Sequence, residues 1–349
     1  MNNVLKTVLR PLGGLYGGIM SFRNFLYKKN IFRASQFDLK IISVGNLSVG
    51  GTGKTPHVEL LVSLFEDEYN LGILSRGYGR RTKGFLLANE HPTAQEIGDE
   101  PAQYQSKFGE KHVVAVGEER AMAIPQMLYQ HENINMIILD DAFQHRAVDR
   151  DVNIMLTEFQ RPFYDDFIMP AGRLREKRIG ASRADIVIIT KCPADLSKTQ
   201  AAQMSTEVQR YAGEDTPVFF SSIKYGKLKS VQNHNETLDW ADKTYLLTGI
   251  ANANPMKEYI SHYSQIIHHD EKADHFHYSE FRVEKILERF EKETSGNGMI
   301  VTTEKDMVKL TNPSILELLK GKSIAYLPIE IDILFDKKDE LKSEITKKL

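Results

Sequence analysis

The chain has 349 residues, of which 41% are hydrophobic and 26% charged, a composition typical of a globular protein with room for two domains. Its formal net charge of −2 gives no general reason to expect a nucleic-acid partner, and no segment indicates an obligate protein partner. No apolar run reaches the roughly 18 residues of a membrane-spanning helix. The single cysteine, Cys192, cannot form an internal disulfide, which favours a reducing compartment.

Residues 1–37 form a basic segment without a single acidic residue, and we expect an amphipathic helix there. Its apolar side chains recur three and four residues apart, namely Leu12, Leu15, Ile19, Phe22 and Leu26. A basic amphipathic helix with aromatic residues is typical of a segment lying in a membrane interface, attracted to anionic lipid. The alternatives are a helix packed by this face on the core and a signal peptide, which the glycine pairs at 13–14 and 17–18 disfavour.

A short strand followed by a glycine-rich turn forms the central motif, LKIISVGNLSVGGTGKTP over residues 39–56. Glycines allow backbone N–H groups to converge on phosphate oxygens, Lys54 can reach the β- and γ-phosphates, and the Thr55 hydroxyl can ligate Mg²⁺. Ser48 stands where the usual phosphate-loop pattern begins with glycine. The motif predicts a nucleoside triphosphate site formed by Ser48, Val49, Gly50, Gly51, Thr52, Gly53, Lys54 and Thr55.

Three polar motifs lie beyond the phosphate loop, two of them at the ends of further strands. A strand at 71–74 leads into SRGYGRR, residues 75–81, which suits an anion-facing loop because ligands bind off the carboxyl ends of parallel strands. Asp99 and Glu100 lie in the sequence GDEP, which alone indicates a solvated acidic turn. An apolar strand at 136–139 ends in Asp140 and Asp141, where phosphate-loop enzymes place carboxylates for Mg²⁺.

The later strands extend the α/β pattern into a second domain. The basic loop PAGRLRE at 170–176 includes Arg175, which either clamps a phosphate or belongs to a solvated face. Alternation of strands and helices predicts a mostly parallel sheet flanked by helices. We expect an interface helix at 1–37, a phosphate-loop core at 38–222, and a smaller α/β domain at 223–349 whose last helix is free to pack on the core.

A histidine-rich stretch precedes the end of the second domain. Asp274, His275 and His277 lie together, but no CxxC or HExxH pattern accompanies them, so zinc is a weak interpretation. An Asp–His pair that orients or tunes a catalytic base is the sharper hypothesis.

The ordered motifs together resemble the tetraacyldisaccharide 4′-kinase family, the lipid A 4′-kinases of Gram-negative bacteria. The resemblance rests on GNLSVGGTGKTP, SRGYGRR, GDEP, LDDAFQH, PAGRLRE, LTGIANANP, DHFHY and TTEKDMVKL, in this order across residues 45–310. It implies transfer of the ATP γ-phosphate to the 4′-hydroxyl of a tetraacyldisaccharide 1-phosphate, a lipid A precursor. It also implies a monotopic enzyme on the cytoplasmic face of the inner membrane, with residues 1–37 at the membrane surface.

The resemblance implies roles for individual residues. ATP and Mg²⁺ are the expected cofactors, with Thr55, Asp140 and Asp141 at the metal and Glu100 assisting. Asp99 matches the general base, and His275 matches the histidine that works with it. Positions near the phosphates or the lipid headgroup are matched by Tyr78, Arg120 and Arg175.

Two departures and one competing function remain open at this point. Ala142 stands where the family has glycine, a modest change unless the backbone needs a positive φ. The family's DHH is Asp274-His275-Phe276 here, so either His275 or His277 faces the base. The alternative function is another phosphate-loop ATPase or GTPase switch at the membrane, but guanine selection loses support because Pro193 replaces the aspartate that a guanine-reading motif needs.

Overall fold

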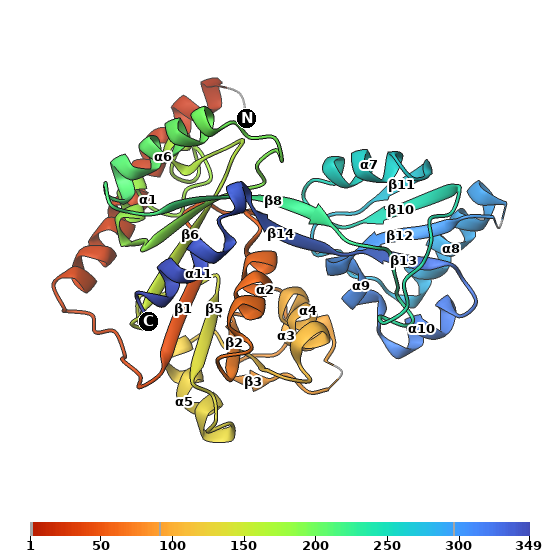
Figure 1. Ribbon diagram of the computed structural model, residues 1–349, viewed down its shortest axis with the longest axis horizontal. Coiled ribbons are helices and arrows are strands. Elements are labelled where there is room, and N and C mark those ends of the chain that lie inside the picture. The colour runs from red at the N-terminus through yellow and green to blue at the C-terminus, as the bar shows by residue number, and fades with distance from the viewer. Residues whose placement is uncertain (1–2, 91, 296) are drawn as a thin grey trace. The chain divides into compact units, whose positions relative to one another are not determined.

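The computed structural model describes residues 3–90, 92–295 and 297–349, and the chain divides into two compact units (Figure 1). Unit 1 comprises the described residues up to Arg76 together with Gly117–Ile223 and Ile331–Leu349, and unit 2 comprises Gly77–Val116 and Lys224–Glu330. The change from unit 1 to unit 2 at Ile223–Lys224 lies beside the expected boundary at residue 222, whereas segment 77–116 was expected in the core and Ile331–Leu349 in the smaller domain. Segment 77–116 belongs to unit 2 because its buried apolar side chains share one core cluster with those of the later chain.

Unit 1 is built on a run of parallel strands in the order β8-β7-β6-β1-β5-β2. The strands are β1 (Lys40–Asn46), β2 (Leu71–Ser75), β5 (Met136–Asp140), β6 (Val152–Glu158), β7 (Ile186–Thr190) and β8 (Val218–Tyr225). Most of their residues are buried and β-branched or aliphatic, as expected of a parallel sheet covered on both faces. The mostly parallel α/β fold predicted from the sequence is confirmed.

Helices surround this sheet and supply the rest of the unit 1 core. They are α1 (Asn3–Lys28), α2 (Lys54–Phe65), α5 (Arg120–Gln130), α6 (Lys198–Ala212) and α11 (Lys338–Thr346), with 3-10 turns at Phe163–Asp165, Arg178–Arg183 and Leu334–Asp336. Helix α2, which follows the phosphate loop, buries Val58, Leu61 and Phe65 almost completely. This burial fixes the start of α2 relative to β1 and β5.

Helix α1 packs on unit 1 through its glycines and leaves its apolar stripe exposed. A methyl group added at Gly17 would lie 2.7 Å from Cδ1 of Ile168, so the helix approaches this side chain closely. The opposite stripe is between 56% and 68% exposed at Leu12, Leu15, Ile19 and Phe22. Within the described part of the chain, no helix combines the length and apolarity needed to cross a membrane.

Unit 2 has a smaller sheet in the order β11-β10-β12-β13-β9, parallel except for β9. Its strands are β9 (Lys229–Ser230), β10 (Lys243–Thr248), β11 (Gln265–Glu271), β12 (Met299–Thr303) and β13 (Ile324–Leu327), with an antiparallel pair β3 (Leu86–Leu87) and β4 (Val113–Val116). Its helices are α3 (Ala94–Ile97), α4 (Asp99–Phe108), α7 (Asn254–Ser261), α8 (Glu280–Thr294), α9 (Glu304–Leu310) and α10 (Pro313–Leu319).

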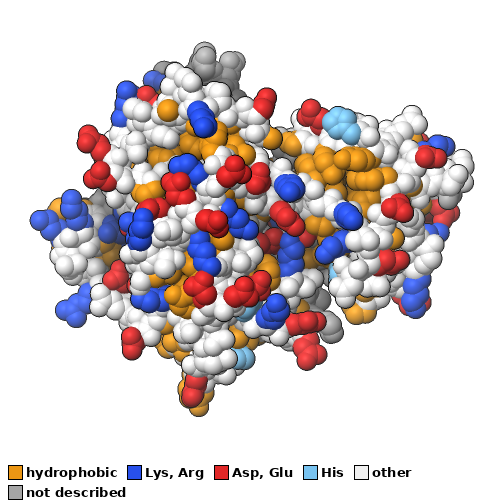
Figure 2. Space-filling view, in the orientation of Figure 1, with side chains coloured by type: hydrophobic (Ala, Val, Ile, Leu, Met, Phe, Trp, Pro, Cys, Tyr) orange, Lys and Arg blue, Asp and Glu red, His pale blue; other side chains and the backbone are white. Residues whose placement is uncertain are grey.

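The apolar run 324–333 is divided into β13 and β14 (Ile329–Ile333) at Pro328, which lacks the N–H needed to continue a ladder. The change from unit 1 to unit 2, between Ile223 and Lys224, lies within strand β8. On the face of the molecule in Figure 2, positive and negative side chains are interspersed, in keeping with the small net charge.

Candidate active site

The glycine-rich turn of unit 1 leaves a helix N-terminus without a side-chain cap. Gly50 and Gly53 have φ values of 110° and 84°, which favour glycine, and Gly53 is the N-cap of α2 without a side-chain hydrogen bond. The first N–H groups of a helix need acceptors and attract anions. The start of α2, with Lys54 as its first residue, is therefore suited to a phosphate.

Buried polar side chains hold this turn in place. The Asn46 amide donates to Oγ1 of Thr52 at 2.8 Å, and the Thr190 hydroxyl donates to the Thr52 carbonyl at 2.9 Å. His57 donates from Nδ1 to the Gly53 carbonyl at 2.7 Å. Burial lowers the pKa of His57 to about 4, so this ring is neutral at physiological pH. The turn is thus preorganised by neutral donors.

Two further residues, from segments distant in sequence, contact the turn. Lys191, which has a φ of 56°, donates to the Gly51 carbonyl and to Oε1 of Glu158. The Arg173 carbonyl accepts a hydrogen bond from the N–H of Val49 at 2.8 Å. No local pattern in the sequence predicts these contacts, because they follow from the strand order and not from spacing along the chain.

The paired aspartates lie at the end of β5, beside the strand that leads into the turn. Val44 of β1 is in register with Asp140, whose carboxylate is 4% exposed and accepts from the Ser75 hydroxyl at 3.1 Å. Oδ1 of Asp141 lies 3.7 Å from Nζ of Lys54, and the Asp141 carboxylate accepts hydrogen bonds from two nitrogens of Arg175 at 3.1–3.3 Å. Burial opposes ionisation of Asp141, but Lys54 and Arg175 overcome it and lower its pKa.

The conformation of this turn explains why alanine is tolerated at 142. Asp141, and not Ala142, takes the left-handed conformation, with a φ of 47°. Ala142 is fully buried, and the next polar side chain, Gln144, donates to the Asn46 carbonyl at 2.8 Å. The substitution therefore needs no strained backbone.

Arg120 lies behind the aspartates. Its side chain is 2% exposed, and it donates to the Asp140 carbonyl at 3.1 Å and to the Glu118 carbonyl at 3.2 Å. Burial lowers the pKa of Arg120 to about 10. In this structure Arg120 supports the backbone of Asp140 and does not face solvent as a direct substrate contact would require, whereas Arg175 is partly exposed.

The donors of unit 1 fit a magnesium ion. Mg²⁺ prefers oxygen ligands and is usually held by one or two carboxylates, a hydroxyl and substrate phosphates. Thr55, Asp140 and Asp141 supply such oxygens at the start of α2 and the end of β5. Among the described residues no three His, Cys, Asp or Glu side chains form a metal cluster of their own.

In unit 2, an aspartate–histidine pair forms at the start of α4. Asp99, the first residue of α4, accepts a hydrogen bond at Oδ2 from Nδ1 of His275 at 3.0 Å, and this bond raises the pKa of His275. His275 has a φ of 60°, an unusual backbone conformation that occurs at functional sites. His277 instead lies 3.2 Å from the amide of Gln95. His275 is thus the histidine that contacts Asp99.

Helix α9 places two lysines around this pair. Lys309, 5% exposed, lies 3.8 Å from Oδ2 of Asp99 and 2.7 Å from Oδ1 of the fully buried Asp306. Lys305, one helical turn earlier, lies 3.4 Å from Nε2 of His275. Both lysines belong to the motif TTEKDMVKL, whose spacing places them on one helix face. The spacing of four residues between these lysines is the sequence signal that could have identified them.

Two other residues with expected roles lie in the same unit. Glu100, for which the resemblance implies help with the metal, is ion-paired with Lys305 at 3.1 Å. Tyr78 is 67% exposed, and its ring centroid lies 5.2 Å from that of His275. Tyr78 is thus accessible beside the Asp99–His275 pair.

Comparisons with known proteins identify the family. The family model described as tetraacyldisaccharide-1-P 4′-kinase matches residues 5–349. A tetraacyldisaccharide 4′-kinase of Cytophaga hutchinsonii is 41% identical over 98% of this chain and 96% of its own length, and one of Bacteroides thetaiotaomicron is 39% identical over 97% and 91%. The crystal structure of an "apo" form of LpxK from Aquifex aeolicus in complex with ATP has a TM-score of 0.74, 27% identity and 99% coverage of both chains. The chain therefore belongs to the tetraacyldisaccharide-1-P 4′-kinase family.

Proposed function

We infer that this protein is an ATP-dependent lipid kinase of lipid A biosynthesis, which phosphorylates the 4′-hydroxyl of a tetraacyldisaccharide 1-phosphate. Its membership of the family, and the names of relatives that match nearly their whole length, support the reaction and the acceptor. The structural observation that supports ATP as the phosphate donor is the uncapped start of α2 beside Lys54, Asp140 and Asp141. Binding of ATP by the similar Aquifex protein supports the same donor here.

Unit 1 is proposed to hold the donor. Backbone N–H groups at the start of α2, from Gly53 to Thr55, bind the phosphates, and Lys54 neutralises charge on the β- and γ-phosphates. Thr55, Asp140 and Asp141 would hold Mg²⁺, which would offset the negative charge of the phosphates. Arg175, now paired with Asp141, is placed to contact a phosphate.

Unit 2 is proposed to supply the proton acceptor. A carboxylate that accepts the hydroxyl proton makes the attacking oxygen a better nucleophile. With Oδ2 of Asp99 bonded to His275, its Oδ1 is the atom that takes this proton. His275 orients the carboxylate, and Tyr78 lies beside the pair as a candidate contact for the sugar headgroup.

Helix α1 is proposed to lie in the interface of the inner membrane, on its cytoplasmic face. The exposed stripe of Leu12, Leu15, Ile19 and Phe22 supports an apolar environment for this face, and the glycine side packs on Ile168. The opposite arrangement, with the stripe on the core, would leave these side chains buried. An interfacial position gives the enzyme access to an acceptor that resides in the bilayer.

Phosphate transfer tests the proposed function directly. Purified protein in detergent micelles is incubated with γ-³²P-labelled ATP, Mg²⁺ and tetraacyldisaccharide 1-phosphate, and the lipid product is separated. We expect a bis-phosphorylated lipid, and a fall of about 10²- to 10⁴-fold in kcat for Asp99→Ala, because a positioned base contributes about that much. Lys54→Ala should also lose transfer. Hydrolysis of ATP without any labelled lipid would refute the assignment.

A further inference from the structure

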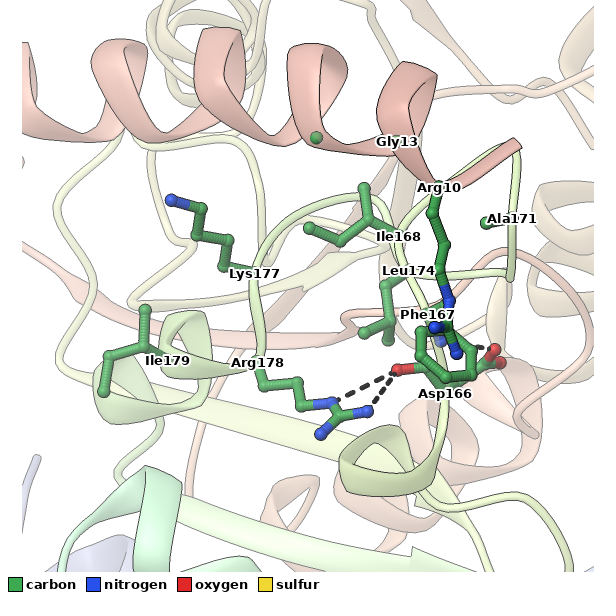
Figure 3. Close-up of a pocket in the computed structure, with 11 residues that line it drawn as sticks. Arg10, Gly13, Asp166, Phe167, Ile168, Ala171, Leu174, Lys177, Arg178 and Ile179 are labelled. Atoms are coloured by element: carbon green, nitrogen blue, oxygen red, sulfur yellow. Dashed lines mark hydrogen bonds between the residues drawn. The ribbon is translucent and has the colours of Figure 1, made fainter. Parts of the chain in front are cut away.

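Helix α1 contacts unit 1 in two different ways along its length. Its N-terminal half lies over the segment 166–179 through small residues, and a Cβ at Gly13 would lie 3.1 Å from the Ile168 carbonyl (Figure 3). Its C-terminal half instead makes polar contacts around Asn24 with the motifs LDDAFQH and PAGRLRE. Both motifs carry residues of the candidate active site. This half of the helix therefore contacts the segments that form the site.

Glu176 is the buried acceptor of these contacts. It is 2% exposed, and a Cβ at Gly180 would lie 2.8 Å from its Oε2, so the carboxylate is closely enclosed. Arg183 donates to both of its oxygens, at 2.7 and 2.9 Å. The Asn24 amide donates to Oε2 at 2.7 Å, and the Gln144 amide donates to Oε1 at 3.2 Å. A buried carboxylate needs such donors in place of water, so these three side chains set its orientation.

Gln144 connects Glu176 to the phosphate loop. The nitrogen that donates to Glu176 also donates to the Asn46 carbonyl at 2.8 Å, and the Asn46 amide donates to Oγ1 of Thr52 at 2.8 Å. Oε1 of Gln144 accepts a hydrogen bond from Arg175 at 3.3 Å. A continuous run of hydrogen bonds therefore leads from α1 to the phosphate loop.

Two arginines hold the helix at this point independently of the Asn24 side chain. Arg146 donates to the Asn24 carbonyl at 2.9 Å, and Arg23 donates to the Gln144 carbonyl at 3.1 Å. Both guanidinium groups also lie over the Tyr27 ring, at 5.1 and 5.3 Å from its centroid. Loss of the Asn24 amide alone should therefore leave α1 in place.

We propose that Asn24 is a positioning residue for the ATP site, and the inference rests on the proposed function. Asn24 orients the Glu176 carboxylate, and that carboxylate orients Gln144. Gln144 in turn holds the carbonyl of Asn46, the last residue of β1, where the phosphate loop begins. Helix α1 is thus part of the structure that shapes the nucleotide site, in addition to its proposed place at the membrane. Removal of the Asn24 amide should weaken the binding of ATP, and not the binding of lipid.

Substitution of Asn24 tests this proposal with a matched control on the same helix. Asn24→Ala removes the donor to Glu176. Ser21→Ala, one turn earlier, removes a hydroxyl that donates to the Gly17 carbonyl of the same helix at 2.6 Å. Alanine favours a helix, so both variants should fold. Asn24→Gln keeps an amide on a longer side chain and serves as the conservative variant.

Affinity for a fluorescent ATP analogue with Mg²⁺, measured in detergent micelles without lipid acceptor, is the main readout. A hydrogen bond to a charged group changes an equilibrium by about tenfold or more, and part of this effect should reach the loop, so we expect the Kd of Asn24→Ala to rise about threefold to tenfold. Asn24→Gln should recover part of the affinity, and Ser21→Ala should bind like wild type. The KM for tetraacyldisaccharide 1-phosphate and co-sedimentation with phosphatidylglycerol vesicles should not change.

A double-mutant cycle tests whether Asn24 acts through Glu176. Glu176→Gln already weakens the acceptor, so adding Asn24→Ala to it should raise the Kd by a smaller factor than in the wild-type background. Independent, multiplicative effects on Kd would refute action through Glu176. This readout separates positioning from a general loss of stability, which urea unfolding of each variant measures.

Three other results would overturn the proposal. Equal Kd values for Asn24→Ala and Ser21→Ala would refute the positioning role. A rise in Kd with an equal loss of vesicle binding would show that the whole helix has moved, and it would refute a role specific to Asn24. Wild-type protein that does not bind the ATP analogue would refute the proposed ATP site together with this inference, whereas the other outcomes leave the proposed function intact.

Discussion

Lys309 is expected to position Asp99, and Lys309→Met removes its charge while keeping an unbranched side chain. The ammonium lies between two carboxylates, 2.7 Å from Asp306 and 3.8 Å from Asp99, and it is almost completely buried. Met occupies similar space along the apolar stem. The substitution therefore tests the charge more than the packing.

The expected effects can be estimated from the contacts. Removing one partner of a buried ion pair costs about 3–5 kcal/mol, and the lower value is expected because Asp306 keeps the Gly249 N–H at 2.7 Å and the Thr303 hydroxyl at 2.7 Å. At a distance of 3.8 Å, the ammonium of Lys309 attracts the Asp99 carboxylate by at most about 4 kcal/mol. Because His275 still holds the carboxylate, we expect kcat to fall by only about tenfold, or about 1.4 kcal/mol.

Urea unfolding and steady-state kinetics of the full chain measure these two effects separately. Lys309→Arg should restore most of the stability and part of kcat, because it keeps the charge. Asp306→Asn is the matched control: it weakens the anchor but leaves the ammonium beside Asp99, so it should cost stability with a smaller loss of kcat. If folded Lys309→Met has the kcat of wild type, Lys309 does not position Asp99.

Three further predictions concern the dyad, the phosphate loop and α1. Asp99→Asn removes the carboxylate whose hydrogen bond raises the pKa of His275, so NMR titration should show the His275 pKa falling, and an unchanged titration would contradict the pairing. The stability that the pair contributes is fully present below the pKa of His275 in the unfolded chain, near 6.5, and is lost as the pH rises through its pKa in the folded protein. Burial lowers the pKa of His57 from 6.5 to about 4, so the unfolded state binds more protons and the free energy of unfolding should fall by roughly 3 kcal/mol as pH drops through that window. His57→Gln should show a shallower fall in urea titrations at pH 7 and pH 5, and an identical slope would exclude His57 as its source. A triple variant with aspartates on the exposed stripe of α1 carries Leu15→Asp, Ile19→Asp and Phe22→Asp. It should lose binding to anionic vesicles while keeping its affinity for an ATP analogue. Retained binding to the vesicles would refute the interface helix.

Contiguous motifs could be interpreted from the sequence because their function depends on local backbone conformation. The phosphate loop is one such motif: a buried strand, glycines and Lys54 specify the turn and the helix start within a few residues. The strand that leads to the paired aspartates was predictable for a related reason, since an apolar run specifies a buried strand and β5 ends at Asp140. The role of these aspartates at Mg²⁺ stays a prediction. The order of motifs across the chain was enough to predict the family, which the comparisons confirm.

Only the tertiary structure decided contacts between residues far apart in the sequence. Hydrophobic periodicity predicted that α1 is amphipathic, but both faces were candidates for burial until packing on Ile168 placed the glycine side inward. The choice of His275 over His277 depends on the backbone turn at 275, and the role proposed for Lys309 depends on α9 packing against α4. The sequence by itself thus determined which chemical groups are present and their local conformation. The folded chain determined which of them meet, because strand order and helix packing set distances that spacing along the chain does not.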